Sequence, residues 1–364
     1  MKKIIEHTNL SDLDKDKIDK LYPIKLTPYL ISQAQKHESI KKQFFASFSE
    51  FDTDVDTLEP FKGLLHVDMD AFERLYEDRI VLKLNSVCPA HCRFCYRRAY
   101  VFGKNKNIKE DDKNKALDLI KSQKGIRTIL LTGGSPLLIG IKKIKSLLEE
   151  IVLLEQISQV YFALGRPIMD PSLITIEFAE MISTLNRLHK NVNIACTVHI
   201  NHYDELTEEV VDALNLLTSR GITVWTQSTL LKGINDDEII LSKMYQEFRR
   251  INLIPYYLIH AMPLIGASHF RTSIEKGIKI MKYLEQFSGH ERPIYIVLPS
   301  VGKVQITGNT VLKYKEIDGK RYAILNTPYK TNKFFEVENL KELPANHYTD
   351  KNGYVVGLYL DGID

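Results

Sequence analysis

The sequence predicts an α/β protein built on a (βα)6 barrel, because from about residue 80 short apolar runs alternate with amphipathic stretches. Before residue 70 the chain is charged and reads as helical segments, and after residue 300 short apolar runs are separated by turn residues. We therefore expect three parts: a helical N-terminal extension at 1–69, the barrel core at 70–300, and a small β-rich segment at 301–364.

The barrel core is expected to contain seven strands and six helices. The apolar runs that read as strands are 80–84, 128–132, 160–164, 192–198, 223–227, 253–258 and 294–298. The amphipathic stretches that read as helices are 113–121, 142–154, 176–188, 208–219, 237–249 and 274–287. This alternation indicates a parallel sheet, and barrels of this kind carry their active sites at the carboxyl ends of the strands.

The two flanking parts carry no recognisable chemistry. In the first, helical segments surround a stretch at 21–28 and are followed by an acidic patch at 50–59. In the last, short strands are expected at 304–306, 311–314, 321–325 and 354–360, with turns at 307–309 and 318–319.

Composition excludes several classes of protein. The 364 residues are 44% hydrophobic and 26% charged, an ordinary globular mixture. The net charge is 49 − 46 = +3, too small to indicate binding to nucleic acid. No apolar run approaches the roughly 20 residues that cross a bilayer, and the amino terminus turns polar too early for a signal peptide. We expect a cytoplasmic protein without nucleic-acid or membrane partners.

Three of the four cysteines, Cys88, Cys92 and Cys95, lie in the run CPAHCRFC directly after the first expected strand. A disulfide framework is disfavoured in a reducing compartment, and a zinc site would need a fourth ligand, whereas Cys196 is far away in the sequence. Three thiolates can hold three irons of a [4Fe–4S] cluster and leave the fourth iron open to a small molecule. The alternatives are a zinc site and three unrelated small apolar residues.

This three-then-two spacing after the first strand of a (βα)6 array resembles the radical S-adenosylmethionine (SAM) enzymes. The resemblance implies a partial, TIM-like barrel and a [4Fe–4S] cluster on Cys88, Cys92 and Cys95. It also implies that SAM binds the open iron and that reduction of the cluster releases a 5′-deoxyadenosyl radical. An electron donor such as flavodoxin or ferredoxin is then an expected partner.

Further segments, in the same order along the chain, resemble the lysine 2,3-aminomutase family over roughly residues 70–310. Besides the cluster loop they are LTGGSPLL at 131–138, LGRPIMDPSLIT at 164–175, HINH at 199–202, QSTLLKGIND at 227–236, PYY at 255–257 and HFRT at 269–272. The resemblance implies that SAM is contacted by Gly133, Gly134, Ser135, His199 and Gln227. The glycine pair also permits close approach of the backbone to a ligand.

The same resemblance implies a second cofactor, pyridoxal 5′-phosphate (PLP). Lys303, in PSVGKV at 299–304, matches the lysine that forms a Schiff base with PLP, and Tyr76 matches a tyrosine that contacts it. The arginine that precedes this tyrosine in the family is Leu75 here, with Arg74 one position away. Arg97 matches the arginine that pairs with the substrate carboxylate, a role that suits a bidentate guanidinium.

The implied reaction moves the amino group of an α-amino acid from Cα to Cβ. Lysine specificity in the family depends on two aspartates, but the matching positions here are Met262 and the apolar pair at 297–298. A buried ammonium without a carboxylate partner is costly, so we expect a substrate other than lysine. Its side chain would be small, apolar, or acidic if His260 or a nearby basic residue reaches it.

The family's long form carries late cysteines that bind zinc, whereas this chain has no cysteine after Cys196, so zinc is not expected. If the chain forms a homodimer, that dimer must be built differently. Other outcomes stay open at this point: decarboxylation, epimerisation, modification of a protein-bound residue, or a non-catalytic member that binds only an Fe–S cluster or a metal.

Overall fold

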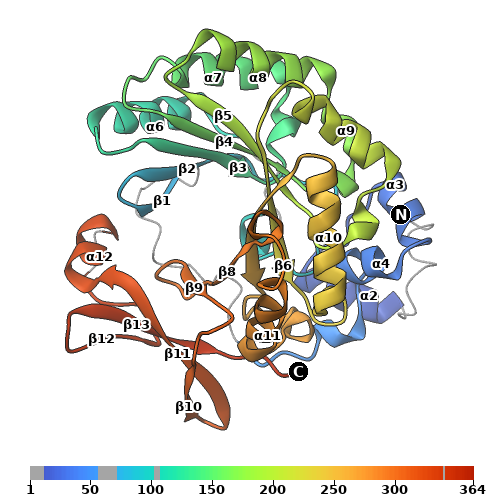
Figure 1. The fold of residues 1–364 in the computed structure, drawn as a ribbon, viewed down its shortest axis with the longest axis vertical. Helices are drawn as coiled ribbons and strands as arrows, with labels where there is room; N and C mark the ends of the chain where they lie inside the picture. Colours follow the sequence, from blue (N-terminus) through green and yellow to red (C-terminus); the bar gives the residue numbers. More distant parts are fainter. Residues whose placement is uncertain (1–11, 56–71, 102–106, 339–340) are drawn as a thin grey trace.

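The computed structural model describes residues 12–55, 72–101, 107–338 and 341–364. Its centre is a nine-stranded sheet in the order β1-β2-β3-β4-β5-β6-β7-β8-β9 (Figure 1). Neighbours from β2 to β8 pair in parallel, while β1 and β9 pair antiparallel at the two edges. The strand order follows the chain order, as it does in a barrel that is wound from successive βα units.

The strands of this sheet are β1 (Phe72–Tyr76), β2 (Arg79–Asn85), β3 (Thr128–Gly133), β4 (Gln159–Gly165), β5 (Asn193–His199), β6 (Val224–Leu230), β7 (Ile254–His260), β8 (Ile294–Val297) and β9 (Val304–Ile306). The helices that follow them are α5 (Arg98–Val101), α6 (Glu110–Ser122), α7 (Ile141–Ile151), α8 (Ile176–Leu188), α9 (Glu208–Thr218), α10 (Glu238–Arg250) and α11 (Ile274–Leu284). The predicted partial (βα)6 barrel is confirmed, and each expected strand and helix is present with shifts of a few residues at its ends.

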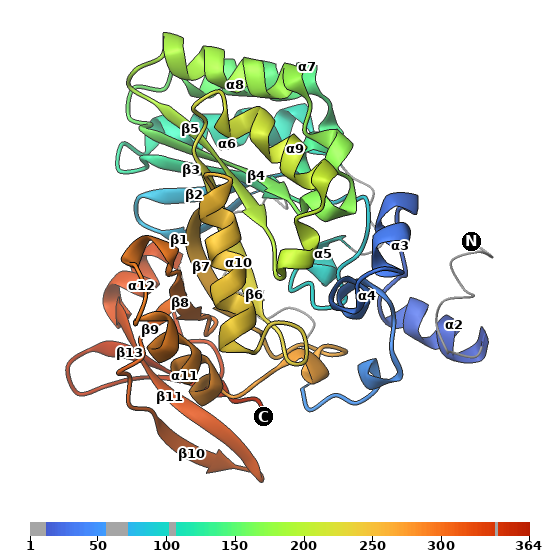
Figure 2. The ribbon, with the colours of Figure 1, turned by 45° about the vertical axis from the view of Figure 1, so that its right-hand side comes forward.

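Helices α6 to α11 lie along the outer face of the curved sheet (Figures 1 and 2). Each of them buries one stripe of apolar side chains against the strands. In α8, for example, Phe178, Ile182 and Leu185 are buried, and the side chain of Thr175 caps the first turn by accepting a hydrogen bond from Phe178 N. This packing leaves the inner face of the sheet to the residues of the site.

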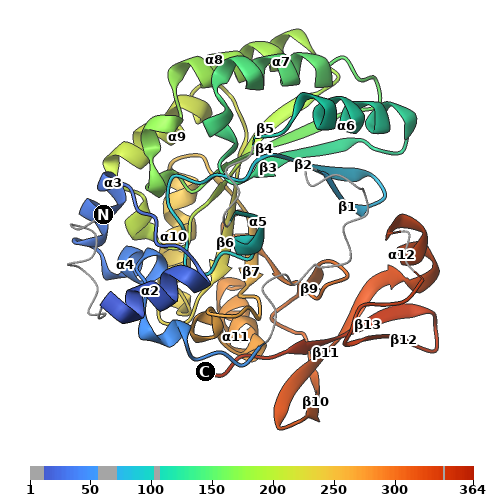
Figure 3. The same cartoon turned by 180° about the vertical axis from the view of Figure 1, so that it is seen from behind.

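The predicted N-terminal helices are confirmed as α2 (Asp12–Leu21), α3 (Pro28–Ala34) and α4 (Glu38–Phe44). Figures 2 and 3 show them grouped on the opposite side of the molecule from the C-terminal strands. They contact the loops at the carboxyl ends of the barrel strands, since Thr27 Oγ1 donates to Met169 O (2.5 Å) and Lys42 Nζ donates to Gly233 O (3.1 Å).

The C-terminal segment forms a second, antiparallel sheet in the order β10-β11-β13-β12. Its elements are β10 (Lys313–Ile317), β11 (Lys320–Lys330), α12 (Thr331–Glu338), β12 (His347–Thr349) and β13 (Tyr354–Leu360). The turn expected at 318–319 joins β10 to β11, with φ of 50° at Asp318 and 71° at Gly319, as a tight hairpin requires.

Two expectations at the ends of the barrel need correction. The strand expected at 311–314 begins only at Lys313, because Val311 is 89% exposed. The strand β1 was not anticipated. It forms a hairpin with β2 across Glu77 and Asp78, a turn without the Gly or Asn that usually marks one.

No helix among the described residues has the length and apolar character needed to cross a membrane.

A glycine substitution tests the contact between α11 and β8. A Cβ at Gly277 would lie 2.1 Å from Tyr295 Oη, so we expect Gly277→Ala to destabilise the protein by about 1–3 kcal/mol, although alanine is the better helix former. Gly125→Ala is the matched control, because its Cβ would meet nothing within 4 Å. Urea denaturation measures both, and equal midpoints for the two variants would contradict this packing.

Candidate functional site

The loop that follows β2 carries the three cysteines, and the N-terminal extension holds this loop in place. Lys25 Nζ donates to Cys88 O (2.6 Å), and the backbone N–H groups of His91 and Arg93 donate to Lys25 O and Gln43 O (both 2.9 Å). The N-terminal extension, which showed no recognisable chemistry in the sequence, therefore holds the backbone of the cysteine loop by hydrogen bonds.

Two arginines fix the loop from within. Arg93 is fully buried and forms a bidentate ion pair with Glu50, with Arg93 Nη2 2.5 Å from Glu50 Oε2. Arg98 donates to three backbone carbonyls, those of Arg93, Cys95 and Ile265. Both guanidinium groups lie 4.9 Å from the ring centroid of Tyr22. The loop is thus held rigidly by contacts that do not use its thiols.

The three thiols affect one another electrostatically. Burial raises the pKa of Cys88, and the neighbouring Cys95 and Cys92 raise it further. Burial also raises the pKa of Cys92 to about 11, although Arg166 opposes this shift. Three thiolates at this place need a cationic partner, and an iron–sulfur cluster supplies one.

In the described part of the chain, no three His, Cys, Asp or Glu side chains converge on a single metal ion. This arrangement still fits a [4Fe–4S] cluster, because each thiolate then binds its own iron and the sulfurs need not meet at one point. Cys88, Cys92 and Cys95 are free and would hold the cluster. Cys196 is fully buried on β5.

Gly133, Gly134 and Ser135 lie directly beside the start of the cysteine loop. A Cβ at Gly133 would lie 2.2 Å from Asn85 O, and one at Gly134 would lie 2.2 Å from Val87 O. Ser135 N donates to Val87 O (2.6 Å), and Asn85 Nδ2 donates to Ser135 O (2.8 Å). The close approach that the glycine pair was expected to allow is therefore made here between two segments of the chain itself.

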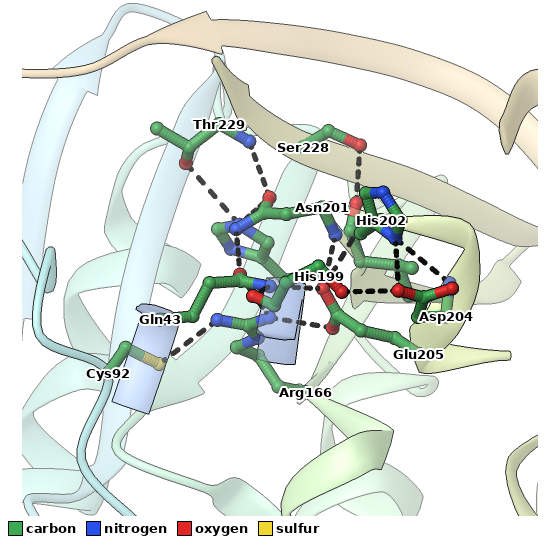
Figure 4. Close-up of polar contacts among 12 residues, drawn as sticks. Gln43, Cys92, Arg166, His199, Asn201, His202, Asp204, Glu205, Ser228 and Thr229 are labelled. Atoms are coloured by element: carbon green, nitrogen blue, oxygen red, sulfur yellow. Dashed lines mark hydrogen bonds and ion pairs between the residues drawn. The ribbon is translucent and has the colours of Figure 1, made fainter. Parts of the chain in front are cut away.

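A buried polar network joins β4, β5 and the N-terminal helix α4 (Figure 4). Arg166, just after β4, donates through Nη2 to Glu205 Oε2 (2.6 Å) and to Gln43 Oε1 (2.7 Å). Its Nη1 lies 3.6 Å from Cys92 Sγ. The side chains of Arg166 and Glu205 are only 3% and 1% exposed, so this pair is isolated from water and links the cysteine loop to three other elements.

His199 ends β5, whereas Gln227 lies in the middle of β6, and the two are paired in register. His199 Nε2 lies 2.8 Å from Asn201 Oδ1 and 3.3 Å from Thr229 Oγ1, contacts that Figure 4 shows. Burial, with Arg166 adding to it, lowers the pKa of His199 to about 3, so the imidazole is neutral at physiological pH. The structure brings the two residues side by side, but the strand expected to end at Gln227 continues to Leu230.

Lys303 follows β8 in a turn and lies among aromatic rings. Its Nζ is 4.6 Å from the ring centroid of Tyr257 and 5.3 Å from that of Tyr76. Burial, and then the positive charge of Arg79, lower its pKa to about 7. Gly302, at φ 128°, is required here because a Cβ would lie 2.7 Å from Tyr329 Oη.

Two residues of this pocket were missed in the sequence. Tyr329, on β11, accepts a hydrogen bond from Lys303 N (3.1 Å), and its ring centroid lies 6.5 Å from that of Tyr76. Arg79 begins β2, and its buried Nε has no hydrogen-bond partner in the described residues. Arg79 therefore offers a partly buried cation whose charge acts on Lys303, whereas the side chains of Arg74 and Leu75 lie outside the described residues.

Arg97 was expected to present an open guanidinium to a carboxylate, and the structure shows a carboxylate already in its fork. Arg97 Nη1 and Nη2 donate to the two oxygens of Glu73 (2.8 and 3.1 Å), and Lys83 Nζ lies 3.0 Å from Glu73 Oε1. Burial opposes ionisation of Glu73, but Arg97 and then Lys83 lower its pKa to about 2. Glu73 is therefore ionised at physiological pH.

The positions expected to recognise the end of the substrate are apolar. Met262 belongs to a buried cluster with Phe270, and Leu298 and Phe94 pack against the same cluster. Phe94 lies between Cys92 and Cys95, so this apolar cluster reaches the cysteine loop.

His260 does not face the site. On β7 Tyr257 points to Lys303, so by alternation His260 points to the opposite face of the sheet. There its Nδ1 lies 2.8 Å from Tyr295 Oη, which in turn contacts Gly277 of α11. The suggestion that His260 reaches an acidic side chain of the substrate is therefore wrong.

The fold and the three-cysteine loop together define a radical SAM protein, and the model of the radical SAM superfamily matches residues 82–242. The chain is 35% identical over 303 residues to a putative L-lysine 2,3-aminomutase of Aquifex aeolicus, covering 81% of this chain and 80% of that protein. This chain therefore belongs to the lysine 2,3-aminomutase family.

Two further relatives carry different substrates in their names. Identity is 28% to the L-lysine 2,3-aminomutase of Fusobacterium nucleatum, over 75% of this chain and 64% of that protein. It is also 28% to the glutamate 2,3-aminomutase of Clostridioides difficile, over 83% of this chain and 71% of that protein. Because the two identities are equal, they favour neither substrate.

The buried network can be tested through Glu205. Glu205→Gln leaves the Arg166 guanidinium without its counter-charge, and removing one partner of a buried pair costs about 3–5 kcal/mol. The control is Glu247→Gln, which breaks an exposed pair with Arg250 and should cost less than about 1 kcal/mol. Urea denaturation compares the two, and a similar loss in both would show that Arg166 is not held as described.

Proposed function

We propose that this protein is a radical SAM, PLP-dependent 2,3-aminomutase that converts an α-amino acid other than lysine to its β-isomer. The observation that carries the proposal is the buried Lys303, whose amine lies 5.3 Å from the ring centroid of Tyr76 and 4.6 Å from that of Tyr257, and whose pKa is lowered by burial and by the charge of Arg79. A lysine with a pKa of about 7 holds a large fraction of neutral amine, the form that condenses with an aldehyde.

When bound, the reduced [4Fe–4S] cluster with SAM would supply a 5′-deoxyadenosyl radical, and PLP would supply the aldehyde that holds the amino group of the substrate. The side chains of the protein bind and orient these cofactors and the substrate. Cys88, Cys92 and Cys95 hold the cluster, while Gly133, Gly134, Ser135, His199 and Gln227 line the SAM side. Lys303 and Tyr76 hold PLP, with Arg79 at its phosphate, and Arg97 takes the substrate carboxylate. A small donor such as flavodoxin or ferredoxin delivers the electron.

The side chain of the substrate is proposed to be apolar. Met262 and Leu298 stand where lysine-specific members carry aspartates, and both pack on one apolar cluster with Phe94 and Phe270. An ammonium buried among these side chains would lack a counter-charge, which costs several kcal/mol. A side-chain carboxylate of the substrate would not be paired with His260, because His260 points away from the site.

Product analysis tests the proposal. The reconstituted, reduced protein is incubated with SAM, PLP and each proteinogenic amino acid, and products of unchanged mass are separated from their α-isomers by chromatography and mass spectrometry. We expect a β-isomer of an apolar amino acid, with no product from Lys303→Arg, which keeps the charge but cannot condense with PLP. Efficient formation of β-lysine would refute the substrate assignment, and decarboxylated or epimerised products would refute the reaction.

The ionisation of Lys303 gives a pH dependence. Only the neutral amine reacts with PLP, so borohydride-trapped PLP at Lys303 should rise through about pH 7 and level off above it. Exposed lysines, with an ordinary pKa of about 10.4, should keep gaining label up to pH 9. Peptide mass spectrometry reads all sites in one digest. If Lys303 follows the exposed lysines, the amine is not buried as the structure shows.

A further inference from the structure

The ion triad of Glu73, Arg97 and Lys83 lies between the two cofactor regions of the site. On β2 the alternate positions Arg79 and Lys83 share one face, and Asn85 follows after an irregularity in register. The charge of Arg79 acts on Lys303, and Asn85 O accepts the N–H of Gly134 beside the cysteine loop. At about 3.3 Å per residue, Lys83 stands roughly 13 Å from Arg79 along the strand. A substrate that reaches both regions must pass this triad.

The charges of the triad do not cancel. In the part of the chain that the structure describes, two cations share the one carboxylate of Glu73, whose side chain is 14% exposed. Lys83 is 6% exposed and lies 4.5 Å from the ring centroid of Tyr100. An excess positive charge at so dry a place is costly unless a second anion balances it. The three described side chains therefore carry one excess positive charge, which one further carboxylate would neutralise.

The backbone around Glu73 allows its side chain to change partner. β1 is an edge strand that pairs only with β2 in the sheet, and its register is irregular between Glu73 and Tyr76. Edge strands with broken register are held by fewer hydrogen bonds than central strands. Glu73 Oε1 is already shared by Arg97 and Lys83, so the carboxylate can leave the first cation without leaving the second.

We propose that Glu73 stands in for the substrate carboxylate: it fills the fork of Arg97, and the incoming amino acid displaces it onto Lys83. In the resting site one carboxylate is shared by two cations. After the exchange there are two separate ion pairs: the substrate carboxylate binds Arg97, and Glu73 binds Lys83. This inference rests on the proposed function and adds to it, because it names Lys83 as a positioning residue and requires a free α-carboxylate. An internal residue of a protein chain has no such group and would not open the fork.

Binding measurements test the exchange. Isothermal titration calorimetry on the reconstituted protein compares L-alanine with L-alaninamide, which keeps the amine but lacks the carboxylate. We expect wild type to bind the acid at least tenfold more tightly than the amide. Glu73→Gln should strengthen binding of the acid about tenfold and leave the amide unchanged, because the internal competitor is lost. In turnover it should lower KM for the acid.

Lys83 provides the second arm. Lys83→Met removes the cation that receives Glu73, so binding of the acid should weaken about tenfold. In the double variant Glu73→Gln/Lys83→Met this loss should disappear, because no carboxylate then needs a new partner. Glu73→Asp keeps the charge and serves as the conservative control, with binding closer to wild type than to Glu73→Gln.

Three results would overturn the proposal. Weaker binding of the acid in Glu73→Gln would mean that Glu73 contacts the substrate directly. An equal change for acid and amide would mean that Glu73 acts only on the fold. Additive effects of the two substitutions would mean that Lys83 does not receive the displaced carboxylate. Since calorimetry needs no turnover, these results stand whether or not the product assay finds a β-amino acid.

Discussion

The buried ion pair between Arg166 and Glu205 is the constraint on which the arrangement of this site depends. The guanidinium leaves β4, the carboxylate belongs to the turn after β5, and Gln43 of α4 bridges the two. The same arginine lies against Cys92 and lowers the pKa of His199. One buried charge pair thus sets the distance between the cysteine loop, the SAM side of the barrel and the N-terminal helices. Because an unpaired charge there is so unfavourable, these elements are expected to move together or not at all.

Much of this architecture could be predicted from sequence, because the alternation of apolar runs and amphipathic stretches is strong in the barrel. The positions of Cys88, Cys92, Cys95 and Lys303 followed from short local motifs. Partners that are distant in the chain could not be found this way. Glu73 lies in an edge strand whose turn lacks a glycine, and Tyr329 lies in the C-terminal sheet. His260 was misplaced because the face of a strand depends on register, and β7 has an irregularity beside Tyr256.

The site is graded in polarity from one end to the other. At Arg166 the guanidinium is paired with Glu205, and its Nη2 makes two short hydrogen bonds, which suits a loop that must hold its shape. At Met262 and Leu298 the wall is apolar and contributes shape without charge. Between them, Arg97 and Lys83 share a single carboxylate. Under the proposed function, the adaptable part of the site would meet the substrate and the rigid part would hold the cofactors.

Tyr329 has a consequence for how the protein is made. The wall around Lys303 combines Tyr76 from the first strand of the sheet, the turn after β8, and Tyr329 from a strand near the carboxyl terminus. These pieces meet only after β11 has left the ribosome and paired with β13. During synthesis the barrel strands can assemble while the pocket is still open on one side. If PLP binds at Lys303 as proposed, its capture would follow translation of the last strands, because the C-terminal sheet supplies Tyr329 to the wall around Lys303.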